Sequence, residues 1–181
     1  MGKTTVSGNQ NAGKQGFIEA CLESTMEPIV GCFLAIPEAQ RYTRALGTLS
    51  APCCVFAHIA LAEERMLKGF TCGIAESRCP FPRDLFNLSQ PPTEEQLRQA
   101  VPDTSKLVDF WRDVRKDTLE FLKGLTPEDL AKGAERSILP DGHPRRDNPI
   151  RDYFMMAINH QVGHWGVLRA ISTVLGVTPR R

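Results

Sequence analysis

One long helical segment, residues 149–176, constrains this chain more than any other feature. Asn148 is a favourable N-cap, Pro149 suits the first helical position, where its missing N–H is not needed, and Gly176 is a favourable stop. About 27 residues at ~1.5 Å each make a rod of ~40 Å, which is long enough to cross a small domain. Apolar residues recur along it with the helical period, so one side of the rod is expected to face a core. That side consists of Tyr153, Met156/Ala157, Val167/Leu168, Ile171 and Val174/Leu175.

Two histidines, His160 and His164, interrupt this apolar stripe. A spacing of four residues places both side chains on one face of a helix, one turn apart. Two imidazoles in this arrangement can share one metal ion, although each can also be an ordinary core histidine with a single hydrogen bond. Catalytic zinc-type sites use three protein ligands and one open position, so a third ligand must come from elsewhere in the chain.

The first part of the chain predicts two further helices. The first begins near Gln15 or Phe17 and continues to Ile36, and Pro28 is expected to kink it or to mark a restart. The second begins after an N-cap at Ser50 and ends before Gly73.

The middle of the chain predicts a third long helix after Asp103/Thr104. Its expected buried positions are Leu107, Trp111, Val114, Thr118, Phe121/Leu122 and Leu125. Residues 71–92 are rich in proline and glycine and predict a long loop, which is either a lid over a site or plain surface. A capping box at Thr93 opens a short helix, Thr126 opens another, and Asp141-Gly142 indicates a turn.

His58, in the second predicted helix, is the best candidate for a third ligand. Its neighbours three and four residues away are apolar or small, so its side chain is expected to point toward the core. Glu63, Glu64 and Lys68 are assigned to the solvated face of the same helix. His143 lies in a polar loop and is expected to be exposed rather than to bind a metal.

Composition narrows the class of protein. The net charge is +1 with acids and bases intermixed, which argues against a nucleic-acid-binding stripe. No apolar run approaches membrane-spanning length, and the polar start is not a secretory signal, so a cytoplasmic protein with six reduced cysteines is expected. Residues 1–14 are interpreted as a disordered leader and residues 15–181 as a single domain. The predicted fold is an all-α, up-and-down four-helix bundle, in which sites are built from facing helices.

Three segments together resemble a known family: AHIALAEERML at residues 57–67, ILPDGHP at 138–144, and NHQVGHWGVLRAISTVLGVTPR at 159–180. They are similar to the DinB-like/YfiT-like superfamily, whose members are four-helix bundles with one histidine on the second helix and an HxxxH pair on the fourth. The resemblance spans residues 17–179. It implies that His58, His160 and His164 bind a divalent metal, commonly zinc or nickel and sometimes iron or manganese, and that the protein is a homodimer. Trp165-Gly166-Val167 stands where many members have an Arg-Gly-Gln-like stretch.

The resemblance also implies a function, a metal-dependent enzyme of the thiol S-transferase type acting on a small molecule. The metal would bind a low-molecular-weight thiol as its thiolate, and residues 71–92 would help to enclose an electrophile. A metal-dependent hydrolase is a second hypothesis for the function. It needs a general base, and neither Glu63 nor Glu64 shares the helix face of His58 well. A non-enzymatic metal-binding or stress-response protein also stays open.

Overall fold

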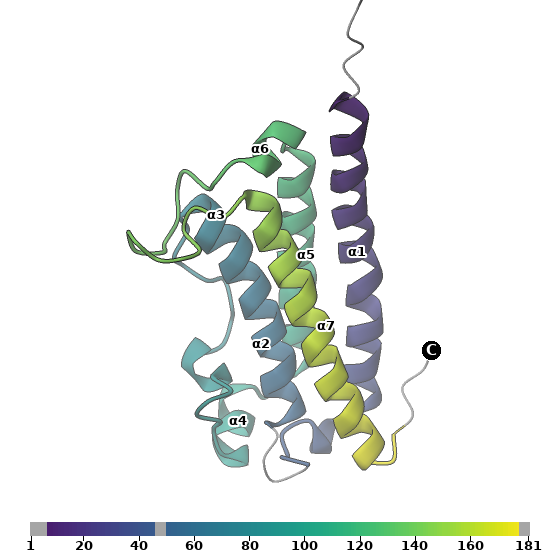
Figure 1. Ribbon diagram of the computed structural model, residues 1–181. Coiled ribbons are helices and arrows are strands. Elements are labelled where there is room, and N and C mark those ends of the chain that lie inside the picture. The colour runs from purple at the N-terminus through teal and green to yellow at the C-terminus, as the bar shows by residue number, and fades with distance from the viewer. Residues whose placement is uncertain (1–6, 46–49, 178–181) are drawn as a thin grey trace, which may run out of the picture.

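The computed structural model describes residues 7–45 and 50–177, and in these residues the chain is an all-α bundle (Figure 1). The structure therefore confirms the predicted fold class, including the short extra helices in the connections. The long helices are α1 (Ser7–Ala35), α2 (Pro52–Glu64), α5 (Ser105–Lys123) and α7 (Ile150–Val174). The shorter elements are η1 (Glu38–Gln40), η2 (Arg65–Gly69), α3 (Phe70–Cys72), η3 (Arg83–Phe86), α4 (Glu94–Ala100) and α6 (Pro127–Ala131).

The topology differs from the predicted up-and-down order. α2 runs back toward the end of the bundle where α1 begins, and residues 73–92 then return the chain to the opposite end before α4 and α5 (Figure 1). α5 consequently runs parallel to its neighbour α2, whereas α7 packs antiparallel to α2. Parallel neighbours in a bundle require a long crossover connection, and residues 73–92 supply it.

The first helix is longer than predicted. It begins at Ser7, so residues 7–14 are helical rather than part of a disordered leader, and residues 1–6 lie outside the described residues. It also continues through Pro28 without a restart. Proline leaves the carbonyl four residues earlier, that of Ser24, without its helical partner, but both residues are exposed, so water can satisfy this oxygen.

Two helix starts lie one residue from their predicted positions. Ala51 rather than Ser50 is the N-cap of α2, which leaves Pro52 as its first residue. Pro149 rather than Asn148 is the N-cap of α7. Neither cap residue makes a side-chain hydrogen bond to the helix, so these two starts depend on the proline backbone geometry and on packing. The predicted capping box at Thr93 is confirmed.

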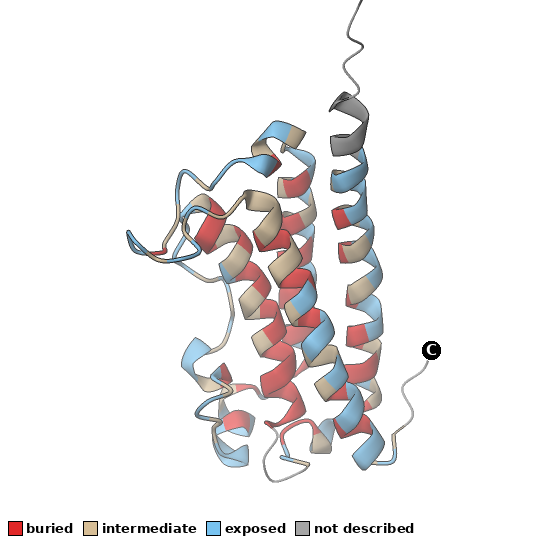
Figure 2. Cartoon of the chain, in the orientation of Figure 1, coloured by how far each residue is buried: buried red, intermediate tan, exposed pale blue. Residues whose placement is uncertain are grey.

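The core fills the space between the long helices, and Figure 2 shows buried residues along their inward faces. At its centre Phe56 of α2 stacks on Phe33 of α1, with ring centroids 4.2 Å apart, and meets Trp111 of α5 edge to face at 5.3 Å. These aromatic contacts join three helices and leave α7 to close the bundle beside α1 and α2. Within the described ranges, no helix combines the length and the hydropathy needed to cross a bilayer.

Candidate metal centre

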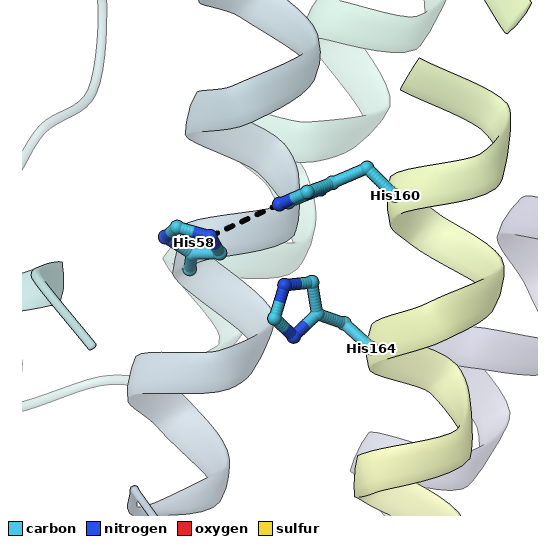
Figure 3. Close-up of side chains that lie close together, drawn as sticks. All are labelled: His58, His160 and His164. Carbon is cyan, nitrogen blue, oxygen red and sulfur yellow. Dashed lines mark hydrogen bonds between the residues drawn. The ribbon is translucent and has the colours of Figure 1, made fainter. Parts of the chain in front are cut away.

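The packing of α7 against α2 brings three histidines together (Figure 3). His58 comes from α2, and His160 and His164 come from successive turns of α7. One ring nitrogen of each lies within 4.8 Å of the other two, and the Nε2 atoms of His58 and His160 are 3.0 Å apart. The ring of His164 lies 4.9 Å from that of His58 and 4.4 Å from that of His160, centroid to centroid. The residues singled out in the sequence therefore converge on one point.

The donor set fits a divalent metal ion. Zinc–nitrogen bonds of ~2.0–2.1 Å in a tetrahedron place ligand nitrogens ~3.3 Å apart, close to the 3.0 Å between His58 and His160. Nδ1 of His160 is buried and has no hydrogen-bond partner among the described residues. The nitrogen of His160 that faces His58 is Nε2, however, so the orphan Nδ1 is not explained by an ion between the rings. The observation that favours a metal is the close approach of the two Nε2 atoms, because one ion can accept the lone pairs of both.

The surroundings keep all three imidazoles neutral. Burial lowers the pKa of His58, and a hydrogen bond from its ring to the Phe86 backbone carbonyl opposes this only in part. Burial, together with the nearby rings of His164 and His58, lowers the pKa of His160 to about 4. Burial and the proximity of His58 also lower the pKa of His164. Neutral rings keep a lone pair on nitrogen, which is the form that binds a metal.

Comparison with protein families gives one match that covers most of the chain: the model of the DinB superfamily matches residues 26–168. The chain belongs to the DinB superfamily. No match was found among curated proteins. All three clustered histidines lie inside the matched region of this DinB superfamily protein.

Two carboxylates near the histidines are placed differently from the sequence prediction. Glu63 and Glu64, assigned to a solvated face of α2, are both buried, with relative exposures of 1% and 4%. Glu63 accepts hydrogen bonds from Nε1 of Trp111 at 2.7 Å and from Nε and Nη2 of Arg115 at 2.8 and 2.9 Å. For Glu63 the prediction is wrong because Arg115 of α5 supplies a buried cation, and a carboxylate that is paired and hydrogen-bonded can be buried.

Glu64 holds the crossover connection against α2. Its carboxylate accepts hydrogen bonds from the Ser77 hydroxyl and, at 3.0 Å, from the Arg78 backbone N–H. Nearby, Asp117 of α5 pairs with Lys68 at 2.7 Å and with Arg78 at 2.6 Å. The segment thus tethered continues to Phe86, whose backbone contacts His58. The loop predicted as a lid or plain surface therefore supports the histidine cluster directly.

Other sequence candidates lie outside the cluster. His143 was expected to be exposed but is half-buried in its loop, where its Nδ1 accepts a hydrogen bond from the Arg145 backbone N–H at 3.1 Å. The structure describes all six cysteines as free, and their reduced state stays a prediction. Arg115 and Gln161 are buried polar residues that sequence reasoning missed. A signal for each was present, because they lie four residues after Trp111 and Ala157, on faces already predicted to be buried.

Proposed function

We propose that this DinB superfamily protein is a divalent-metal-dependent enzyme of the thiol S-transferase type, with His58, His160 and His164 as the metal ligands. The observation that carries the proposal is the convergence of three neutral imidazole nitrogens from two helices. Three neutral ligands leave positions for exogenous groups and keep the full charge of the ion for activating them. The chemistry that such an ion supplies is a lowered pKa of a coordinated thiol, which converts it into a nucleophilic thiolate.

The chain's own residues hold the ligands and restrict access to them. His160 and His164 share one helix face, so their relative position is set by the helix. The Phe86 backbone lies next to His58 and acts against the lowering of its pKa, so its carbonyl is placed to orient that ring. Phe86 is buried and belongs to the connection that Glu64 tethers, so this side of the cluster is covered by protein.

The hydrolase alternative is less well supported. A metal-dependent hydrolase needs a carboxylate or histidine that is free to take a proton from water. Glu63 is occupied by Arg115 and Trp111, and Glu64 by Ser77 and Arg78. With both nearby carboxylates engaged, activation of a thiol by the metal alone is the simpler chemistry.

Cobalt substitution combined with a panel of low-molecular-weight thiols tests the proposal. The cobalt protein is titrated with each thiol and followed by absorption spectroscopy. The expected result is a saturable thiolate-to-cobalt charge-transfer band with at least one thiol, followed by consumption of that thiol when an electrophile is added. Cobalt binding without such a band for any thiol would contradict the transferase proposal and favour a non-enzymatic metal-binding protein. An anomalous-scattering scan of crystals of the purified protein would identify the native ion, with zinc or nickel expected.

A homodimer and a cytoplasmic location complete the proposal. The homodimer rests mainly on the family, and the cytoplasmic location rests on the polar start of the sequence, which does not resemble a secretory signal. Light scattering at tens of micromolar protein is expected to give the mass of a dimer, and the mass of a monomer would contradict this part of the proposal.

A further inference from the structure

Gln161 follows His160 directly, but its side chain is turned by ~100° about α7 and enters a fully closed part of the core. Its side chain is completely buried. Its Nε2 donates to Oε2 of Glu63 at 2.7 Å, and its Oε1 accepts from Nη2 of Arg115 at 2.8 Å. Both ends of the amide are therefore engaged by a buried ion pair that belongs to α2 and α5. We call Glu63, Trp111, Arg115 and Gln161 the buried network.

The buried network connects all four long helices. Arg115 of α5 also donates to the backbone carbonyl of Leu22 in α1, and the hydroxyl of Thr25 in α1 donates to Oε1 of Gln161 at 3.3 Å. The Glu63 carboxylate accepts four hydrogen bonds in all, from Trp111, twice from Arg115, and from Gln161. Such bonds are directional and short, so they specify the rotation of a helix more strictly than apolar contacts do.

Successive residues on an α-helix are turned by ~100° about its axis. The direction of Gln161 therefore determines the directions of His160, one residue earlier, and His164, three residues later. With Gln161 bound to Glu63 and Arg115, the two histidines must face α2 at the level of His58, where the structure places them.

We propose that Gln161 is a positioning residue, which sets the rotation of α7 through Glu63 and Arg115 so that His160 and His164 meet His58. The affinity test of this inference rests on the proposed metal site, whereas the ring positions can be observed without a metal. Residues that orient metal ligands from outside typically change metal affinity ~10–100-fold when they are replaced.

An exchange of side chains gives the sharpest test. The wild-type network contains one carboxylate and one guanidinium. Glu63→Gln removes the carboxylate, and Gln161→Glu places two carboxylates beside one arginine. Glu63→Gln and Gln161→Glu combined restore one carboxylate, one amide and the charge balance, with their helices exchanged. Gln161→Leu removes all three hydrogen bonds of the amide, those to Glu63, Arg115 and Thr25, and leaves the ion pair intact.

Zinc affinity is measured by competition with a chromophoric chelator, and crystal structures of the metal-free proteins give the distance between Nε2 of His58 and Nε2 of His160. Gln161→Leu and each single exchange are expected to lower affinity at least ~10-fold and to separate the two rings. The double exchange should recover most of both properties. Phe154→Leu, a buried apolar change on the same helix outside the buried network, should lower the melting temperature without changing affinity.

Two results would overturn the inference: Gln161→Leu with wild-type affinity and rings in contact, or a double exchange that recovers thermal stability but not affinity. If the wild type binds no metal, the proposed metal function fails instead. The ring positions then decide the inference alone, because rings that stay in contact in Gln161→Leu overturn it and rings that separate support it.

Discussion

The bundle contains two polar clusters close together on α2 and α7, and they are built on opposite principles. The buried network of Glu63, Trp111, Arg115 and Gln161 is charged, closed and hydrogen-bonded at every carboxylate oxygen. The histidine cluster is neutral and half-buried, and Nδ1 of His160 has no partner among the described residues. The carboxylate of the buried network has its hydrogen-bond partners within the chain. The histidine cluster instead presents ring nitrogens that can bind a metal ion.

This contrast separates the two tasks of a polar group in a helical core. A fully satisfied cluster specifies one arrangement of helices, and removal of any member leaves a partner uncompensated. An under-satisfied cluster contributes little to the fold and gains its partners from a ligand. The two clusters should therefore respond in opposite ways to substitution and to metal.

The largest effect on stability is expected from Arg115→Met. It leaves the Glu63 carboxylate buried without its cation, and breaking a buried pair in this way typically costs ~3–5 kcal/mol. The free energy of unfolding, measured by urea denaturation, should fall by that amount. Arg112→Met is the matched control on the same helix, because Arg112 pairs with Glu27 at 3.4 Å in solvent and such pairs are worth ~0–1 kcal/mol. Equal losses for the two variants would mean that the buried network is not a stabilising unit.

His164→Ala should have the opposite profile, with a small effect on the metal-free fold and a large effect on metal binding. It leaves two of three ligands, so affinity should fall by more than the ~10–100-fold that outer residues typically produce. Excess zinc should raise the melting temperature of the wild type, as any ligand of the native state does, and raise that of the variant much less.

His143→Ala is the control for that experiment. His143 contacts Arg145 in a loop and is not a member of the histidine cluster. Its metal-dependent shift should equal that of the wild type. A variant at position 143 that loses the shift, together with one at position 164 that keeps it, would show that the ligands are assigned wrongly.

The smallest effect concerns pH in the absence of metal. The three histidines have lowered pKa values in the folded protein, that of His160 being about 4, against ~6.5 for an unperturbed histidine. Between these values the unfolded chain binds more protons than the folded one, so stability is retained above ~6.5 and falls as pH is lowered toward 4. Melting temperatures recorded in chelator across this range should decline, and His160→Leu should make the decline shallower. A wild-type melting temperature that rises on acidification would contradict the neutral cluster.

Much of this architecture could be predicted because it depends on local periodicity. The helical spacing of His160 and His164, and the apolar neighbours of His58, sufficed to predict that the three rings face one another. Capping boxes and proline positions placed most helix boundaries to within a few residues. The start of α1 at Ser7 was missed, because the polar and glycine-rich sequence before residue 15 carries no apolar period.

The features that were missed depend on pairing between distant segments. Nothing near Glu63 in the sequence indicates Arg115, and a carboxylate on a helix is by default assigned to solvent. The parallel course of α2 and α5 likewise follows from the path of residues 73–92, which has no periodicity to interpret. Periodicity identifies the face of a helix, but the partner across the core decides whether a charge on that face is buried.

The wide turn η2 has a consequence for how this chain can vary in length. In it the Phe70 N–H donates to the carbonyl of Arg65, five residues earlier, instead of the usual four. Such a turn holds one residue more than an α-helical turn while the stretches on either side keep their directions. Deletion of one residue within Arg65–Gly69 would return the segment to a regular helix, with His58 before it and Phe70 after it still facing the core. A lineage of such proteins could therefore gain or lose a residue at this point without rebuilding the bundle.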